Sequence, residues 1–236
     1  LCLQARLFTA KVFALDNDST NSSLIKKKCL KKYVKHQYKC DIRDLKKINS
    51  IVSEVRPDII IHMAAQSLVI SGLENPIFTL DVNIMGTANV IESAKISRSV
   101  KSILVVTSDK VYENNEKNKT FKENDKLGGD DPYSASKACA DIISKSYSSS
   151  YFKRKNVNLA TARAGNVIGG GDVSSNRLVP DIYRSIVEKK KLKIRNKNYI
   201  RPWQNVLDCN NGYMTLIEKL QNNRKYSGAW NFSTNN

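Results

Sequence analysis

The sequence lacks any run approaching the roughly 18 consecutive apolar residues that a membrane-spanning helix needs. Its first residues also lack the charged, apolar and small-residue order of a secretory signal. With 236 residues, 41% of them hydrophobic, the chain is long enough for one α/β domain with a small second lobe. These features exclude a disordered tail and predict a soluble, cytoplasmic protein without a membrane partner.

Cysteine and histidine are too scarce and too scattered for a cross-linked or metal-bound fold. The five cysteines form no Cys-x-x-Cys pair and are accompanied by only two histidines, His36 and His62. Disulfide frameworks and structural zinc sites need closely spaced sets of these residues. We therefore expect neither, and no bound metal. The cysteines are Cys2, Cys29, Cys40, Cys139 and Cys209.

Acidic residues are also in short supply. Asp and Glu number 22 against 39 Lys and Arg, which gives a net charge of +17. Such a field attracts phosphates, nucleic acids and anionic membranes. However, the lysine clusters at 26–28, 31–32 and 189–191 have few aromatic neighbours, and no helix-turn-helix, zinc-finger or ribonucleoprotein motif accompanies them. We interpret the charge as a solvated, lysine-rich surface and do not expect a nucleic-acid partner.

What the sequence does contain is an alternation of short β-branched runs with helical periodicity. Residues 12–15, 58–62, 103–107 and 157–163 are typical of strands. The alternation predicts right-handed crossovers and a Rossmann-like, doubly wound parallel sheet of the α/β class, with a small, incomplete C-terminal substrate lobe.

Helical segments separate the predicted strands. Asp44 is placed to cap a helix that Pro57 stops, and another helix is predicted near 82–94. Pro132 suits the start of a third helix, which then runs over 135–151.

Glycine is absent before Gly72, although a dinucleotide-binding fold ordinarily opens with a strand and a glycine-rich turn. Residues 1–8 are typical of the helix that follows such a turn. Either the chain is a fragment without that first strand and loop, or the protein lacks the usual phosphate cradle. We favour the fragment because residues 12–16 read as an ordinary second strand.

Tyr133 and Lys137 are four residues apart, which puts a phenol and an amine on one helix face. A cation held there favours the phenolate, so Lys137 is expected to lower the pKa of Tyr133 and make it a proton acceptor for an alcohol. The alternative is an ordinary solvated helix. Polar residues also follow the strand runs that end near His62, Thr107 and Arg163, where a doubly wound sheet binds its ligands.

These residues resemble the extended short-chain dehydrogenase/reductase family and, within it, the CDP-glucose 4,6-dehydratases. The resemblance runs nearly from end to end of the chain. Its specific part is Ser108-Asp109-Lys110, since the related dTDP-glucose enzymes have Thr-Asp-Glu there, whereas Tyr-x-x-x-Lys is shared by most relatives. The similar segments are 62–66, 83–87, 107–110, 127–129, 131–137, 163–172 and 201–204.

The resemblance implies a redox-neutral dehydration of a nucleotide-activated hexose, CDP-glucose preferred, on tightly held NAD. Tyr133, assisted by Lys137, would take the proton of the C4 hydroxyl, while Ser108 would polarise the C4 oxygen. Lys110 would remove the C5 proton and Asp109 would protonate the departing C6 hydroxyl. The alternative for Asp109 and Lys110 is a surface ion pair after a strand.

Asp16 follows a predicted strand, where it is placed to accept the adenosine ribose hydroxyls and so favours NAD over NADP; the alternative is a turn residue. By resemblance, other residues flank the adenine, line the cofactor or bind the substrate pyrophosphate and sugar. The cofactor residues are Asp16, Asp41, Ile42, Ala64, Ala65, Gln66, Thr107, Tyr133 and Lys137. The substrate residues are Asn166, Arg177 and Arg201.

The sequence also departs from the family pattern. The loop at 115–121 is polar where an aromatic loop is usual, Val173 replaces a tryptophan, and Asn205 stands where a histidine is common. We predict a Rossmann-type domain at 1–172 and a substrate lobe at 173–236, interleaved with the last elements of that domain, and a homodimer in the complete protein. The alternative functions are a nucleotide-sugar epimerase and a catalytically inactive, basic binding fragment.

Overall fold

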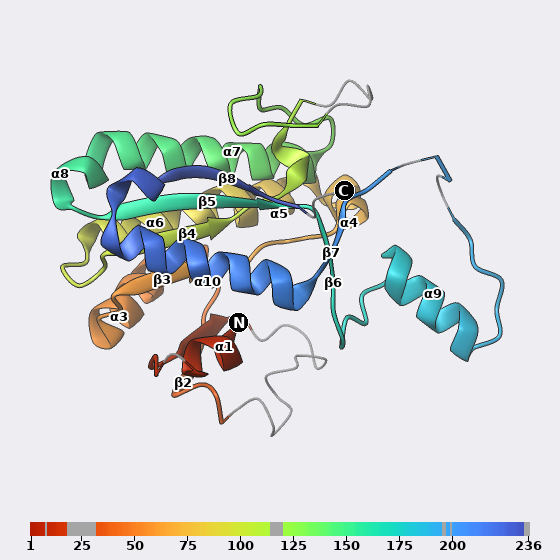
Figure 1. Cartoon of the computed structure of the whole chain (residues 1–236), viewed down its shortest axis with the longest axis horizontal. Coiled ribbons are helices and arrows are strands. Elements are labelled where there is room, and N and C mark those ends of the chain that lie inside the picture. The colour runs from red at the N-terminus through yellow and green to blue at the C-terminus, as the bar shows by residue number, and fades with distance from the viewer. Residues whose placement is uncertain (8, 18–31, 114–119, 195–196, 199, 234–236) are drawn as a thin grey trace.

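The computed structural model describes residues 1–7, 9–17, 32–113, 120–194, 197–198 and 200–233 (Figure 1). Every strand pairs with its neighbours in parallel. The strands are β1 (Phe13–Asp16), β2 (His36–Lys39), β3 (Ile59–His62), β4 (Ser102–Val106), β5 (Asn158–Ala164), β6 (Asn166–Ile168), β7 (Trp203–Asn205) and β8 (Gly228–Phe232).

The main sheet has the strand order β3-β4-β5-β8, while β1-β2 and β6-β7 form separate pairs. Within the described residues β3 is hydrogen-bonded only to β4, so it lies at one edge of the main sheet. The four strand runs predicted from the sequence are confirmed as β1, β3, β4 and β5, each to within about two residues. The parallel pairing and the alternation with helices give a Rossmann-like α/β fold, as predicted.

Helices and helical turns occupy most of the remaining described chain. The helices are α1 (Cys2–Leu7), α3 (Leu45–Val55), α4 (Val69–Glu74), α5 (Pro76–Leu80), α6 (Gly86–Ile96), α7 (Pro132–Tyr147), α8 (Lys153–Lys155), α9 (Leu178–Val187) and α10 (Val206–Asn222). The π-helical turns are η2 (Asp81–Met85) and η4 (Ser148–Phe152), and the 3₁₀ turns are η3 (Asp109–Val111) and η5 (Arg224–Tyr226).

The two faces of the main sheet are covered by different helices (Figure 1). On β4, Leu104 packs with α10, whereas its neighbours Ile103 and Val105 pack with Ile91 of α6. This alternation follows from the pleat of a strand, because successive side chains point to opposite faces. The sheet is therefore buried on both sides, which explains the continuous apolar runs at 59–61 in β3 and 103–106 in β4.

The predicted helix after Asp44 is confirmed. The Asp44 side chain accepts a hydrogen bond from the Lys47 amide at 3.0 Å, and the helix ends at Arg56, which has φ 50°. The other two helical predictions need correction at one end. The segment predicted at 82–94 contains the π-helical turn η2, and the helix predicted to reach residue 151 loses α-helical hydrogen bonding after Tyr147.

The C-terminal quarter of the chain divides between the sheet and a projecting element. β8 pairs with β5 and α10 covers the sheet, so both belong to the main layer. By contrast, α9 lies apart from the sheet on the side to which β6 and β7 extend (Figure 1). The division predicted after residue 172 remains a prediction. None of the helices in the described ranges is long and apolar enough to cross a membrane.

Candidate active site

The predicted site residues follow the carboxyl ends of parallel strands. Asp16 ends β1, Ala64 follows β3, Thr107 follows β4 and Asn166 follows β5. In a doubly wound sheet this edge is the ligand-binding edge.

Tyr133 is held at the first turn of α7 by the cap of that helix. The Asp131 carboxylate accepts hydrogen bonds from the Ser134 amide at 3.0 Å and from the Ser134 hydroxyl at 2.6 Å. Gly129 lets the preceding loop approach, because a Cβ there would lie 2.4 Å from the Ala135 nitrogen. The cap and the close loop fix the tyrosine at the edge of the sheet.

Burial controls the protonation of Tyr133, which is 9% exposed. It raises the pKa of the phenol, while a hydrogen bond with Ser108 and the charge of Arg177 act in the opposite direction. The net direction is therefore upward, because burial outweighs the groups that lower the pKa of Tyr133, whereas the sequence favours a lowered pKa; the contribution of Lys137 to Tyr133 stays a prediction.

Lys137 is directed at the sheet. Its ammonium donates a hydrogen bond to the Val106 carbonyl at 3.2 Å, and the residue is 7% exposed. Burial lowers the pKa of Lys137 to about 8, because a low-dielectric environment disfavours the charged form. The pKa of Lys137 is therefore close enough to neutral pH for its amine to gain or lose a proton there.

Ser108, Asp109 and Lys110 form a compact turn beside Tyr133. The Ser108 hydroxyl donates to Asp109 Oδ1 at 3.0 Å and accepts from the Lys110 amide at 3.2 Å. Ser108 is buried, whereas Asp109 and Lys110 are half-buried. Ser108 also lies close enough to Tyr133 to lower the pKa of the phenol, so the serine, the aspartate and the tyrosine are neighbours in the structure.

A polar hydrogen-bond network joins the family-like segments 62–66, 83–87 and 131–137 and supports the helical turn that carries Tyr133. Asn83 Oδ1 accepts from the backbone amide of Gln66 at 2.8 Å, and Asn83 Nδ2 donates to Ser136 Oγ at 2.8 Å. Ser136 in turn donates to the Tyr133 carbonyl at 2.7 Å. Asn83 lies in the π-helical turn η2, and such turns are frequent at functional sites.

His62 is part of the same support. Its Nε2 lies 3.0 Å from the Thr87 hydroxyl, which donates to the Asn83 carbonyl at 2.6 Å. Burial and, secondarily, the charge of Lys137 lower the pKa of His62 to about 3. The imidazole is therefore neutral at physiological pH and acts as a hydrogen-bonding group rather than as a proton carrier. The sequence signal for this role is a histidine at the end of an apolar strand run.

The predicted cofactor residues differ in what their side chains contact and in how exposed they are at the ligand-binding edge of the sheet. The Asp16 carboxylate accepts a hydrogen bond from Gln37 at 2.6 Å, and the Asp41 carboxylate accepts from Arg43 at 2.7 Å, a bond that lowers the pKa of Asp41. Ala64 is exposed and Ala65 is half-buried.

Two other predicted cofactor residues use their side chains for structure. Ile42 is buried, and a Cβ on Gly86 would lie 2.5 Å from it. The side-chain nitrogen of Gln66, Nε2, donates to the Thr79 hydroxyl at 2.8 Å, and its side-chain oxygen, Oε1, accepts from the Leu68 backbone amide at 2.5 Å. The carboxylate of Asp16 and the small, exposed Ala64 fit a dinucleotide, whereas Ile42 and Gln66 can offer it only their backbones.

Among the predicted substrate residues, Arg177 is the one whose charge lowers the pKa of Tyr133. It donates to Asp172 at 3.2 Å and to Ser67 at 2.9 Å, which ties the start of α9 to the loop after β3. Asn166 is the first residue of β6, and Arg201 precedes β7; the Asn166 backbone amide donates to the Pro202 carbonyl at 2.9 Å.

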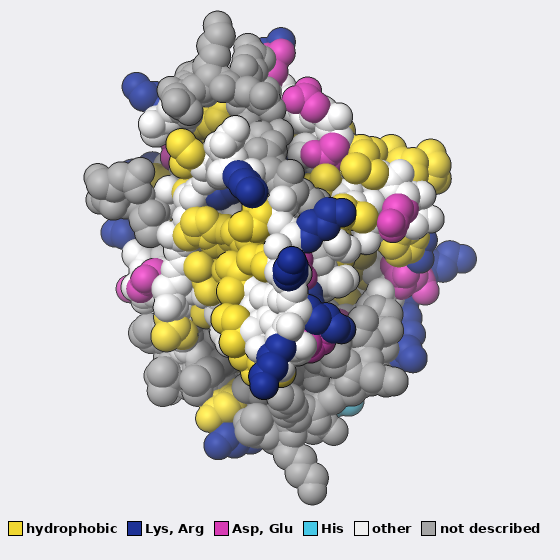
Figure 2. Space-filling model, turned by 90° about the vertical axis from the view of Figure 1, so that its right-hand side faces the viewer, with side chains coloured by type: hydrophobic (Ala, Val, Ile, Leu, Met, Phe, Trp, Pro, Cys, Tyr) yellow, Lys and Arg dark blue, Asp and Glu magenta, His cyan; other side chains and the backbone are white. Residues whose placement is uncertain are grey.

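The face on the α9 side carries both apolar and basic side chains. Figure 2 shows hydrophobic side chains gathered in the middle of this face, with Lys and Arg beside them. Four large apolar side chains of α9 are exposed: Leu178, Tyr183, Ile186 and Val187. Basic side chains on this face suit an anionic ligand.

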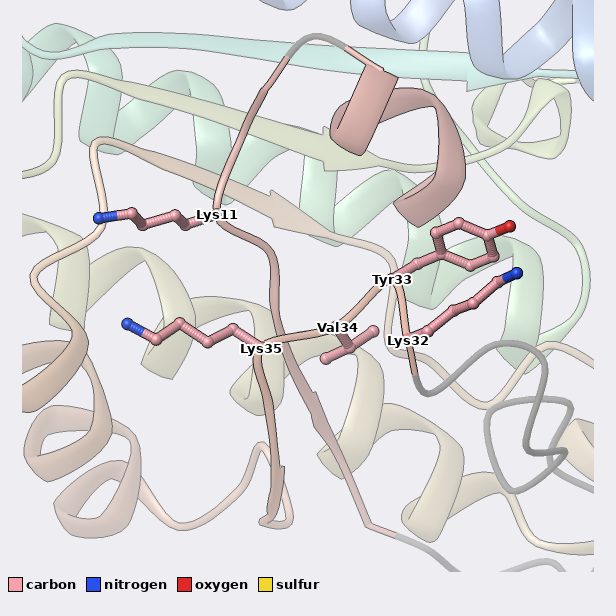
Figure 3. A pocket seen from close by; sticks show the side chains of 5 residues that line it. All are labelled: Lys11, Lys32, Tyr33, Val34 and Lys35. Atoms are coloured by element: carbon pink, nitrogen blue, oxygen red, sulfur yellow. The ribbon is translucent and has the colours of Figure 1, made fainter.

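A separate cavity of about 250 Å³ lies near the amino ends of β1 and β2, away from this edge. Figure 3 shows that its lysines do not converge: Lys11 and Lys35 point one way, whereas Lys32 and Tyr33 point the other. We assign no ligand to this cavity. Within the described ranges no group of three or more His, Cys, Asp or Glu side chains is arranged to hold a metal, and the four described cysteines are free.

Comparison with known proteins places this site in context. The chain is 43% identical over 198 residues to a CDP-glucose 4,6-dehydratase of Salmonella typhimurium, which covers 81% of this chain and 55% of the relative. It is 27% identical to a dTDP-D-glucose 4,6-dehydratase of Dictyostelium discoideum, over 84% of this chain and 48% of that protein. The chain thus spans about half the length of these relatives.

Solved structures agree on the fold. A UDP-glucose 4-epimerase of Thermotoga maritima superposes with a TM-score of 0.84 at 20% identity, over 98% of this chain and 71% of that one. A dTDP-glucose 4,6-dehydratase of Bacillus anthracis, in complex with NAD, superposes with a TM-score of 0.79 at 23% identity, over 100% of this chain and 71% of that one.

The family model described as GDP-mannose 4,6 dehydratase matches residues 5–233. The match includes every residue that the preceding paragraphs assign to the candidate site. The resemblance to extended short-chain dehydrogenases/reductases that the sequence motifs indicated is thereby confirmed. The chain belongs to the GDP-mannose 4,6 dehydratase family, within the extended short-chain dehydrogenases/reductases.

Proposed function

We propose that the protein dehydrates a nucleotide-activated hexose to its 4-keto-6-deoxy form, with CDP-glucose as the preferred substrate. The observation that carries this proposal is the compact Ser108-Asp109-Lys110 turn beside the buried Tyr133. Oxidation at C4 alone needs only the tyrosine, whereas loss of water from C5 and C6 needs an additional base and acid. The 43% identity to a CDP-glucose 4,6-dehydratase supports the choice of nucleotide.

NAD is the proposed cofactor. The Asp16 carboxylate would hold the adenosine ribose, and Asp41, Ala64, Ala65, Thr107 and the backbones of Ile42 and Gln66 would line the cofactor. When bound, NAD supplies a hydride acceptor for C4 and returns that hydride to C6.

The chain's own residues move the protons. Tyr133 Oη, in its phenolate form, takes the proton of the C4 hydroxyl, and Lys137 lies one turn further along the same helix. Once C4 is a ketone, its neighbour C5–H becomes acidic, so Lys110 Nζ can remove that proton. Asp109 protonates the C6 hydroxyl as it leaves as water, and the proton on Lys110 returns to C5.

Ser108 completes the proton balance. After one turnover Tyr133 holds one proton more than before, and Asp109 holds one fewer. The Ser108 hydroxyl donates a hydrogen bond to Asp109 and lies close enough to Tyr133 to lower the pKa of the phenol, so it offers a route for returning that proton to Asp109. Arg177, Asn166 and Arg201 are proposed to bind the substrate, with the arginines on the pyrophosphate.

Lys110→Ala tests the proposal in the complete gene product supplied with CDP-glucose and NAD. The wild type should yield a product lighter by one water, whereas Lys110→Ala should still reduce the nicotinamide yet release no water. Lys101→Ala, which removes an exposed lysine paired with Asp58, is the matched control and should dehydrate normally. Normal dehydration by Lys110→Ala would contradict the role of Lys110, and a wild-type product of unchanged mass with inverted C4 would indicate an epimerase.

We also propose that the complete protein is a homodimer. The neighbouring helices α4, α5 and α7 and the turn η2 expose large apolar side chains, which water disfavours. These residues are Leu73, Ile77, Phe78, Met85 and Ile142. A second copy presenting the same surface would cover them through a two-fold contact.

A further inference from the structure

A buried ion pair between Asp141 and Arg163 lies beneath the candidate site and takes no part in the proposed chemistry. Asp141 is on α7, two helical turns after Tyr133, and Arg163 is on β5; both are 4% exposed. Arg163 Nη2 donates to Asp141 Oδ1 at 2.8 Å, and Nε donates to Oδ2 at 2.9 Å. Charges removed from water are stable only when their remaining hydrogen-bonding groups are also satisfied. The other partners of the pair therefore indicate what it holds together.

The carboxylate is joined to two strands. Thr107, directly after β4, donates to Asp141 Oδ2 at 3.1 Å, and Thr161 of β5 donates to Oδ1 at 3.0 Å. With the two bonds from Arg163, each carboxylate oxygen accepts two hydrogen bonds. Asp141 thus fastens α7 to the sheet at the point where Ser108 begins its turn.

The guanidinium is joined to the far end of that turn. Arg163 Nη1 donates to Tyr112 Oη at 2.8 Å and to the Glu123 carbonyl at 2.9 Å. Tyr112 Oη then donates to Asn231 Oδ1 at 2.5 Å, and the Arg163 guanidinium lies 5.0 Å from the centre of the Tyr112 ring. The tyrosine is therefore fixed by both its hydroxyl and its ring.

Ser108, Asp109 and Lys110 lie between Thr107 and Tyr112, so both ends of this segment are bonded to one ion pair. The same pair anchors the helix that carries Tyr133 and Lys137. We propose that the Asp141–Arg163 pair is a positioning element that keeps the dehydrating residues, Asp109 and Lys110, in register with the oxidising residues on α7. This inference rests on the proposed function and deepens it by explaining how two half-reactions act on one bound sugar.

Two variants separate positioning from general stability. Tyr112→Phe removes the hydroxyl that ties the turn to Arg163 but keeps the aromatic ring. Thr161→Val is the matched control, because it removes a hydrogen bond to the same buried carboxylate from a strand that does not carry the turn. Both variants should lower the thermal midpoint.

The first measurement is hydrogen–deuterium exchange of the complete gene product without substrate. Tyr112→Phe should raise the exchange rate of the amides at 108–112 by about tenfold, as expected for losing one hydrogen bond to a charged group. Thr161→Val should leave that segment unchanged. Equal exchange at 108–112 in the wild type and Tyr112→Phe would overturn the inference.

The second measurement follows the two half-reactions during turnover. Because small displacements of reacting groups reduce rates severely, Tyr112→Phe should slow water loss at least about tenfold and change C4 oxidation less than about twofold. Reduced nicotinamide should then accumulate, as it should not in Thr161→Val. If Tyr112→Phe slows C4 oxidation and water loss equally, the Asp141–Arg163 pair has only a structural role. If the wild type performs neither step, the proposed function fails. The hydrogen–deuterium exchange at 108–112 then tests by itself whether the ion pair positions this segment.

Discussion

Tyr133 and Lys137 are one helical turn apart and both buried, yet burial shifts their pKa values in opposite directions. It raises the pKa of the phenol and lowers that of the amine, because in each case it disfavours the charged form. Spacing alone predicts the pairing of these residues on one helix face. It cannot predict the direction of the tyrosine shift, which depends on how much of the surrounding protein excludes water.

Lys137→Met should change how the free energy of unfolding depends on pH. In the folded protein the pKa of Lys137 is about 8, below its ordinary 10.5, so between these values the unfolded chain binds more protons. Stability contributed by Lys137 therefore rises with pH across this window, by roughly 3 kcal/mol at most. Lys137→Met removes the buried charge and should be more stable than the wild type near pH 7, with the advantage shrinking toward pH 10.5.

Denaturant unfolding at a series of pH values measures this difference. Lys101→Met, at an exposed lysine, is the control and should run parallel to the wild type. If Lys137→Met also runs parallel to the wild type, Lys137 is not titrating in the protein's interior.

Local sequence signals account for the elements that were predicted correctly. Asp44 and Pro57 mark the ends of α3, and β-branched runs mark β3 and β4. The π-helical turn η2 could not be predicted, because the bonds of Asn83 reach Gln66 and Ser136 from distant segments. The Asn- and Gly-containing helix α10 was missed for a similar reason: it is stabilised by burial of Leu216, Ile217 and Leu220 against the sheet.

Removing the caps of α7 and α3 should have similar effects on stability and different effects on activity. Asp131 and Asp44 each accept a hydrogen bond from a backbone amide of the first helical turn at 3.0 Å. Either Asp→Ala substitution should lower the free energy of unfolding by about 1 kcal/mol. Because only the Asp131 cap adjoins Tyr133, we expect turnover to fall in Asp131→Ala and to be retained in Asp44→Ala at a temperature where both are folded.

Thermal unfolding and steady-state turnover test this expectation together. The cap of α7 has no role in placing Tyr133 if Asp131→Ala turns over substrate as fast as Asp44→Ala.

At the scale of the whole molecule, the alternation of strands and helices predicted the Rossmann-like sheet and its ligand-binding edge. The polar motifs identified the family. The contacts that join distant segments were not predictable, since the Asp141–Arg163 pair links a helix to a strand 22 residues away. The sequence also contains no signal for which apolar helix positions stay exposed after folding.

Charge introduced on the exposed apolar helices should separate the proposed dimer. Ile77 of α5 is 77% exposed and Ile142 of α7 is 54% exposed, so lysine at both positions should leave the folded monomer intact. We expect the double variant to sediment as a monomer where the wild type sediments as a dimer, because a symmetric contact repeats each charge. Ile186→Lys, on α9, is the control and should remain dimeric. A double variant that stays dimeric would place the contact elsewhere.

The position of β3 at the edge of the main sheet affects how this protein must be handled. Along its side away from β4, the described structure gives no hydrogen-bonded strand to cover Ile59, Ile60 and Ile61. Three consecutive isoleucines on an open strand edge are a template for intermolecular β-addition, the first step toward insoluble aggregates. Any length of this protein chosen for expression should therefore be judged first by whether it shields that edge.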